Sequence, residues 1–254
     1  VQQNGIAAYG AAVGLDLAPA QDAATDPNQL FVKRRDAGVT AAAVAGKEDN
    51  PGAEFAARSR GEKYSAGGIK TTVVATRAAS DAELTRNAQA LLDEALAQGT
   101  TTVEIKSGYG LTLRDELRSL DIASAFTDET TLLAAHVIPE EFTNDPQGYV
   151  DLIVKEIIPA SSAKWIDVFC DAGAFSPEQT RAILLAGKGA GMLPRIHANQ
   201  LSRTTAVALA IELDAASADH LSASTDADIE ALAASSTIAN FSQVQNFQRN
   251  TKEG

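Results

Sequence analysis

The sequence is poor in several residue types whose abundance would have placed it in a class of proteins. Its 254 residues include one cysteine, Cys170, one tryptophan and one methionine. A single cysteine cannot form an internal disulfide, and no apolar run approaches the roughly 20 residues that span a bilayer. The chain also opens without the charged and apolar regions of a secretory signal. We therefore expect a cytoplasmic protein with no membrane partner.

Basic residues are too few to balance the acidic ones. Lysine and arginine together number 21 against 33 aspartates and glutamates, which gives a formal net charge of −12 and an isoelectric point near 4.7. Binding to a phosphate backbone requires a positively charged surface. The charge balance therefore argues against a nucleic-acid partner.

Hydrophobic residues make up 45% of the chain, enough for a substantial core. Short β-branched or apolar runs alternate with helical patterns, which favours a (β/α) barrel or a large open α/β sheet. We divide the chain into a poorly defined segment over residues 1–50, a barrel domain over 51–241 and an irregular tail over 242–254. About seven strand regions are predicted, and they begin near Ile69, Thr100, Thr130, Trp165, Pro194, Ala215 and Thr237.

Capping boxes mark the beginnings of two helices. Ser80 and Glu83 open an amphipathic run that ends at Gly99, and residues 176–179 open a second run with proline at its first position. Further helices are predicted over about 112–126, 148–158, 203–213 and 226–234. The glycines at 187–191 match no phosphate-binding loop, since no strand precedes them, and indicate the end of a helix.

The chain has three histidines, and each closes a run that is typical of a strand: His136, His197 and His220. In a barrel of alternating strands and helices, the carboxyl ends of the strands converge on one mouth, where such folds carry out their chemistry. Histidine titrates near neutral pH and is the commonest metal ligand. The three positions therefore predict a shared functional site, whereas each histidine alone would be compatible with a structural role.

Other polar residues leave alternatives open. Glu104 and Lys106 lie on the same face of a strand, where they could form an ion pair inside a barrel. Asp219 precedes His220, but neighbours on a strand point to opposite faces and need not touch. Residues 107–110 (SGYG) could be a substrate loop or an ordinary turn. Cys170 closes an apolar strand and is better explained as a core residue than as a nucleophile.

Five segments together resemble the imidazolonepropionases, a family of the amidohydrolase superfamily. They occur in the family's order and fall within residues 51–240: 100–111 (TTTVEIKSGYGL), 134–142 (AAHVIPEEF), 167–176 (DVFCDAGAFS), 197–202 (HANQLS) and 217–221 (SADHL). The resemblance implies a metal-dependent (β/α)8 barrel of the TIM type, here incomplete. It also implies hydrolysis of 4-imidazolone-5-propionate to N-formimino-L-glutamate in histidine degradation.

The resemblance also implies roles for individual residues. His197 would be a ligand of one divalent metal ion, zinc or iron, while His220 and Gln200 would be catalytic. Three further residues match positions that hold the small-molecule substrate: Tyr64, Tyr109 and His136. A divalent metal lowers the pKa of bound water, and a histidine can move the proton. A homodimer is suggested by the resemblance alone.

The sequence departs from the family in its metal-binding motifs. The family's first metal-binding strand carries a His-x-His pair, but the corresponding residues 41–50 contain no histidine. A late-strand aspartate that completes the family's metal site is not recognisable after Phe241. An alternative interpretation is therefore a metal-free, degenerate barrel that binds a small molecule or is an inactive fragment.

Overall fold

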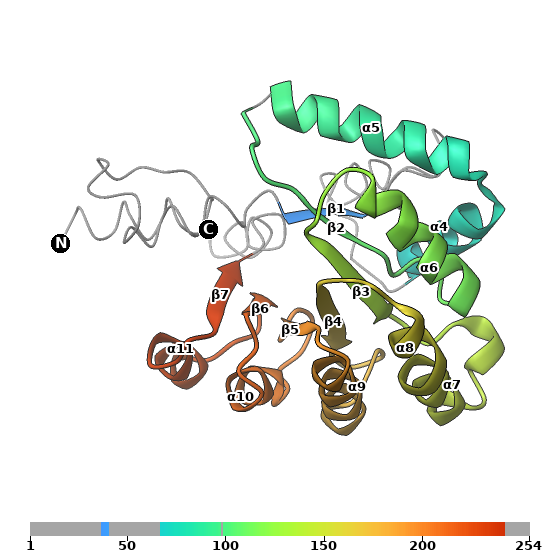
Figure 1. The fold of residues 1–254 in the computed structure, drawn as a ribbon. Coiled ribbons are helices and arrows are strands. Elements are labelled where there is room, and N and C mark those ends of the chain that lie inside the picture. The colour runs from blue at the N-terminus through green and yellow to red at the C-terminus, as the bar shows by residue number, and fades with distance from the viewer. Residues whose placement is uncertain (1–36, 41–66, 98, 242–254) are drawn as a thin grey trace, which may run out of the picture.

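The computed structural model describes residues 37–40, 67–97 and 99–241, and it is an α/β structure (Figure 1). Within these ranges one parallel sheet runs in strict sequence order from β1 to β7. Its strands are β1 (Ala37–Thr40), β2 (Glu104–Lys106), β3 (Thr130–Ala135), β4 (Trp165–Cys170), β5 (Leu193–Ala198), β6 (Ser217–His220) and β7 (Ile238–Phe241). The predicted alternation of strands and helices is confirmed from residue 80 onward.

Helices connect each strand to the next parallel one. Figure 1 shows α7 to α11 side by side along one face of a curled sheet, so that the other face lies inside the curl. The helices are α4 (Gly67–Ala78), α5 (Asp81–Ala97), α6 (Leu113–Ser124), α7 (Pro146–Leu152), α8 (Ile158–Ala160), α9 (Pro177–Gly189), α10 (Ala206–Glu212) and α11 (Asp226–Ala233), with a 3-10 turn (Glu140–Phe142) and a π-helical turn (Ile153–Ile157). No helix among the described residues is long and apolar enough to cross a membrane.

Side chains on successive strand positions separate into two kinds. Apolar residues such as Leu132, Ile166 and Ile196 belong to the main hydrophobic core. Polar residues alternate with them, for example Asp167 between Ile166 and Val168 in β4, and both kinds are buried. A parallel sheet is covered on both faces. Here the second covered face is charged, and it is this face that builds the site.

The predicted helix beginnings are confirmed where the structure describes them. Ser176 forms a reciprocal capping box with Gln179, and the Ser80 hydroxyl accepts a hydrogen bond from the Glu83 backbone N–H. Helix α9 then ends at Gly189, within the glycine run expected to stop it. Cys170 is buried at the end of β4, and burial raises the pKa of its thiol, as suits a core residue.

The predicted strand near Ile69 is wrong, because residues 67–78 form helix α4. The β-branched composition suggested a strand, but the buried residues among the described side chains of α4 recur at spacings of three and four: Ile69, Thr72, Val73 and Thr76. Those spacings define one face of a helix. The Thr76 hydroxyl also donates to the carbonyl of Thr72, one turn earlier, at 2.8 Å.

Strand β1 lies in a part of the chain where the sequence predicted no strand with confidence. It pairs with β2 in parallel and so begins the sheet. The described sheet has seven strands, as counted from sequence, but β1 takes the place of the wrongly predicted one. The predicted domain limits at residues 50 and 241 stay predictions.

Candidate functional site

The three imidazoles converge at the carboxyl ends of strands β3, β5 and β6. His136 directly follows β3, His197 is the fifth residue of β5 and His220 ends β6. The ring centroids of His136 and His197 are 6.2 Å apart, and those of His197 and His220 are 4.8 Å apart. The prediction that these side chains share one location is confirmed.

Asp167 orients the central imidazole. His197 Nδ1 lies 3.0 Å from the Asp167 carboxylate, which comes from the adjacent strand β4 and is fully buried. Burial alone would raise the pKa of Asp167, but His197 and Lys106 outweigh it and hold that pKa well below its usual range. The ionised carboxylate fixes the proton of His197 on Nδ1, which leaves Nε2 free to bind a ligand.

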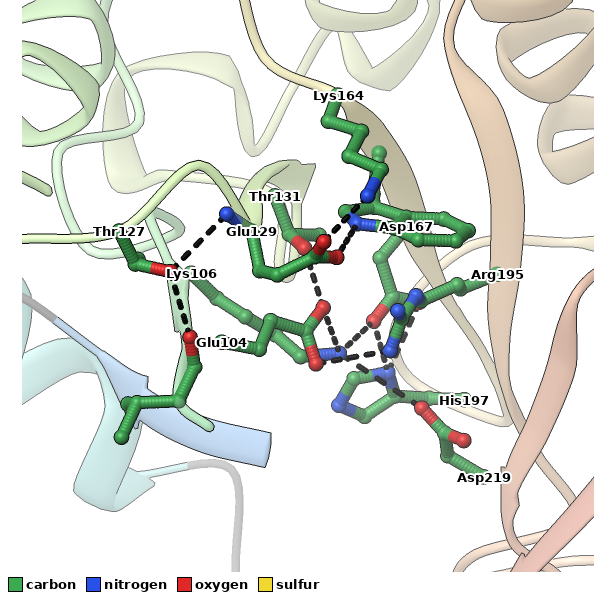
Figure 2. Close-up of polar contacts among 12 residues, drawn as sticks. Glu104, Lys106, Thr127, Glu129, Thr131, Lys164, Asp167, Arg195, His197 and Asp219 are labelled. Carbon is green, nitrogen blue, oxygen red and sulfur yellow. Dashed lines mark hydrogen bonds and ion pairs between the residues drawn. The ribbon is translucent and has the colours of Figure 1, made fainter. Parts of the chain in front are cut away.

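Lys106 places a buried ammonium among three carboxylates (Figure 2). Its Nζ lies 2.6 Å from Asp167 Oδ2 and 3.6 Å from both Glu104 Oε1 and Asp219 Oδ2. Burial would lower the pKa of Lys106, but these carboxylates, Asp167 first, raise it well above its usual range. Lys106 therefore stays charged, and the predicted ion pair with Glu104 is part of a larger network.

The network continues toward the amino ends of the strands. Arg195 Nη1 donates to Glu104 Oε2 at 2.9 Å, and its guanidinium carbon lies 4.0 Å from the centroid of the Trp165 ring. The Trp165 Nε1–H donates to Glu129 at 2.7 Å, and Glu129 also pairs with Lys164. Each carboxylate of the network thus lies beside a cation, and such pairing is the condition for tolerating charges inside a protein.

One set of three side chains among the described residues could hold a metal ion. Single ligand atoms of Asp167, His197 and Asp219 lie within 4.8 Å of one another. Asp219 Oδ1 is buried and has no hydrogen-bond partner in the described part of the chain. An imidazole nitrogen with carboxylate oxygens is a donor set that zinc and iron accept. The residues present therefore fit a cation, although Lys106 already neutralises part of their charge.

His220 combines backbone strain with an unsatisfied ring nitrogen. Its φ of 77° lies in the left-handed region, which is rare for residues other than glycine. Its Nδ1 is buried without a hydrogen-bond partner among the described residues. Burial and then the neighbouring His197 hold the pKa of His220 well below its usual range, so the ring is neutral at pH 7. Such strain concentrates at functional sites.

His136 is held by the loop that precedes α6. Its Nδ1 lies 3.0 Å from the carbonyl oxygen of Gly108, and the edge of the Tyr109 ring packs on it at a centroid distance of 4.9 Å. Burial and then His197 lower the pKa of His136 to about 4. Tyr109 and His136 therefore lie together, whereas Tyr64 lies outside the described residues.

Gln200 lies on a loop that is held in place by the carboxylate of Asp171 and the side-chain amide of Asn199. Asp171 accepts hydrogen bonds from the backbone N–H groups of Leu201 and Ser202, and Asn199 Oδ1 accepts from the N–H of Thr204. Gln200 is 8% exposed, and its Oε1 has no partner among the described residues. The loop thus presents a buried acceptor close to the end of β5.

Several known proteins similar to this chain are imidazolonepropionases. Over 188 residues, or 73% of the chain, it is 59% identical to the imidazolonepropionase of Streptomyces avermitilis and 60% identical to that of Streptomyces coelicolor. The matched part of the chain belongs to the imidazolonepropionase family. The imidazolonepropionase of Rhodococcus jostii is 51% identical over 201 residues. No family model matches the chain.

The chain spans about half the length of the curated imidazolonepropionases that it matches. It covers 45% of the Streptomyces avermitilis protein, 48% of the Streptomyces coelicolor protein and 49% of the Rhodococcus jostii protein. Conversely, the match extends over 73 to 78% of this chain. About half of the sequence of each of these relatives therefore has no counterpart in the matched part of this chain.

Sequence reasoning about the imidazolonepropionase motifs missed two side chains of the site. Asp167 was quoted within a motif and given no role, although it holds both His197 and Lys106. Glu116 was not singled out, although its carboxylate is fully buried against the loop of Tyr109. The available signal for Asp167 was a lone acidic residue inside an otherwise apolar strand, because a charge in such a place must be paired.

Proposed function

We propose that this chain carries the active site of an imidazolonepropionase, which hydrolyses 4-imidazolone-5-propionate to N-formimino-L-glutamate in histidine degradation. The observation that carries the proposal is the convergence of His136, His197 and His220 in a chain 59% identical to such an enzyme. We further propose that β1 to β7 are part of a TIM-type barrel of the amidohydrolase kind. The parallel order and the curl of the sheet support this.

The proposed cofactor is one divalent metal ion, zinc or iron, held by His197. Asp219 is the best second ligand, because its Oδ1 is buried and unpartnered among the described residues. Asp167 would support His197 through Nδ1, as carboxylates commonly do behind a metal-bound imidazole. When bound, such an ion lowers the pKa of a coordinated water and polarises a carbonyl group.

The protein's own residues have separable proposed roles. His220 is neutral and its Nδ1 is unpartnered in the described structure, so it can accept a proton at that atom during water addition. Gln200 offers Oε1 as an acceptor that orients water or substrate. Tyr109 and His136 form one wall of the substrate site, and Tyr64 is assigned to the same role from the sequence. Burial of these groups keeps bulk water from the substrate.

Lys106 favours a second candidate, a metal-free protein that binds a small molecule. Its ammonium lies 2.6 Å from Asp167 and 3.6 Å from Asp219, where it competes with a divalent cation for the same carboxylates. A chain that retains the substrate wall and fills its anionic cluster with lysine would bind ligand without hydrolysing it. This candidate predicts saturable binding with no turnover.

Metal content and turnover, measured together, test the proposal. The purified chain, reconstituted with Zn²⁺ or Fe²⁺, is expected to hold about one equivalent of metal by elemental analysis and to consume 4-imidazolone-5-propionate. His197→Gln should lose metal, whereas Lys155→Gln, at an exposed helical pair, should keep it. A metal-free chain that binds the compound in calorimetry without hydrolysis would support the second candidate and overturn the first.

The role of His220 is tested by a separate variant. His220→Ala is expected to reduce hydrolysis by at least about a hundredfold, the scale of a lost general acid or base, and to leave metal content unchanged. Turnover and elemental analysis on the same sample provide both readouts. Loss of the metal from this variant would instead make His220 a ligand.

A further inference from the structure

The loop before α6 is held from beneath by one buried carboxylate. Glu116, in the first turn of α6, is fully buried. Its Oε2 accepts a hydrogen bond from the N–H of Gly108 at 3.0 Å, and its Oε1 accepts from Gly110 at 2.9 Å and Leu111 at 2.7 Å. Three backbone donors of a five-residue loop are therefore satisfied by a single side chain.

The loop fits around Glu116 only with glycine at two positions. Gly108 has a φ of 110°, and an added Cβ there would lie 2.9 Å from Leu133. A Cβ at Gly110 would lie 2.5 Å from the backbone of Asp115. The loop is thus pressed against α6 and β3 at two of the three residues whose N–H groups donate to Glu116. Its backbone has no room to rearrange while those contacts exist.

Gly108 connects this carboxylate to the site. Its N–H points to Glu116, and its carbonyl oxygen lies 3.0 Å from Nδ1 of His136. A carbonyl oxygen only accepts hydrogen bonds, so Nδ1 of the neutral imidazole must carry the proton, which leaves Nε2 as an acceptor. Tyr109, between the two glycines, packs edge-on against the same imidazole at an interplanar angle of 81°.

We propose that Glu116 is a positioning residue, which fixes the tautomer of His136 and the place of Tyr109 through the loop 107–111. The carboxylate acts on His136 through Gly108. This role is independent of the reaction at the site and goes beyond the proposed function. The carboxylate of Glu116 on α6 thereby determines that His136 offers Nε2 as its hydrogen-bond acceptor in the site.

Nitrogen NMR of the full chain, kept metal-free with a chelator, provides the test. The chain has only three histidines, so its imidazole signals can be assigned with His197→Gln and His220→Gln variants. Wild-type His136 is expected as the Nδ1–H tautomer with an NOE to Tyr109. In Glu116→Gln, the amide oxygen can still accept hydrogen bonds from two of the three backbone N–H groups. The amide NH2 group of the glutamine then faces the third N–H group, and two donors cannot bond to each other. We expect the Gly108 contact to be lost, a mixed tautomer of His136 and a weaker NOE.

The matched control is Asp228→Asn, which removes a carboxylate that accepts a backbone N–H, that of Thr225, at 2.8 Å in the cap of α11. It should leave the His136 signals unchanged. The proposal is overturned if a folded Glu116→Gln protein keeps the wild-type tautomer and NOE. Should that variant fail to fold, the wild type decides: an Nε2–H tautomer of His136, or rapid exchange of the Gly108 amide, overturns it. Neither readout needs metal or substrate.

Discussion

At the scale of single residues, Lys106 shows how the covered inner face of the sheet tolerates charge. The side chains of Lys106, Glu104, Asp167 and Asp219 are each less than 10% exposed, and the three carboxylates would be costlier to bury without the Lys106 ammonium among them. Removal of the Lys106 ammonium therefore lowers the stability of the fold by more than the loss of its contacts alone, because the three carboxylates are left without their shared cation.

Lys106→Met is expected to destabilise the folded chain by about 3–5 kcal/mol, the usual cost of breaking a buried ion pair from one side. Urea unfolding followed by circular dichroism measures this change. Lys155→Met is the matched control, because its pair with Asp151 is exposed on α7 and the adjoining turn. Equal stabilities of the two variants would contradict a structural role for the interior charge.

His136 gives stability a defined pH dependence. Its folded-state pKa is lowered from 6.5 to about 4, so the unfolded chain binds the proton first as the pH falls. The contribution of His136 to the free energy of unfolding is therefore complete above pH 6.5. It is lost between pH 6.5 and about 4, by at most about 1.4 kcal/mol per pH unit. The lowered pKa of His220 acts in the same direction, while burial raises the pKa of Glu116 and opposes it.

His136→Gln separates this contribution from the others, since Glu116 and His220 are present in both proteins. The unfolding free energy of the metal-free variant should fall less steeply between pH 6.5 and 4 than that of the wild type. Denaturant titrations at four or five pH values suffice. Parallel pH profiles of the two proteins would mean that His136 titrates normally.

The histidines of the site could be predicted from sequence because each closes a recognisable apolar run. Asp167 could not be assigned a role, because its partners His197 and Lys106 lie 30 and 61 residues away along the chain. Glu116 looked like an ordinary helical glutamate. Its importance comes from the fold of the preceding loop. From sequence alone, residues 107–110 could be either a substrate loop or a turn.

At the scale of elements, helix α9 packs unusually closely on strand β4. Gly187 faces the strand, and a Cβ added to it would lie 2.6 Å from Cδ1 and 2.7 Å from Cγ2 of Ile166. Gly189, two residues on, has open space around its position. The sequence interpretation of this glycine run as a helix end explains the second position and misses the packing role of the first.

Gly187→Ala is expected to destabilise the chain by about 1–3 kcal/mol, the cost of overpacking a core. Gly189→Ala should be neutral or slightly stabilising, because alanine is the better helix former. Thermal unfolding of both variants tests the difference. In an Ile166→Ala background, the cost of Gly187→Ala should shrink; an unchanged cost would show that Ile166 is not the obstacle.

Helix α4 shows where sequence patterns fail for elements. Residues 71–74 have the composition of a strand, but the buried side chains described in helix α4 form one stripe, and Val74 is 71% exposed. Tertiary packing overrode β-propensity. The longer amphipathic helices were predictable because their capping residues and their apolar period agreed.

At the scale of the whole molecule, the strict sequence order of the parallel strands could be anticipated from the alternation of elements. The pairing of β1 with β2 could not, because the sequence placed no strand within the poorly defined residues 1–50. The predicted homodimer stays a prediction that light scattering can test. The order of the sheet itself has a measurable consequence.

Amide exchange should distinguish the centre of the sheet from its last strand. β4 and β5 are paired on both sides, whereas β7 pairs only with β6 among the described residues. Hydrogen–deuterium exchange followed by mass spectrometry is expected to be slowest in β4 and β5 and faster in β7. Equal protection of β7 would indicate that another strand covers its edge.

The pairing of β4, β5 and β6 also determines how the site can change through evolution. Phe169 pairs with His197, and His197 pairs with Asp219, so the spacing of the site is set by the register of the sheet. One residue inserted within β6 would reverse which side chains face the interior, and Asp219 would leave the cluster. Insertions in the loops that lead from the helices back into the strands leave this register intact. Sequence drift at that end of the sheet can therefore be extensive while the geometry of the histidines persists.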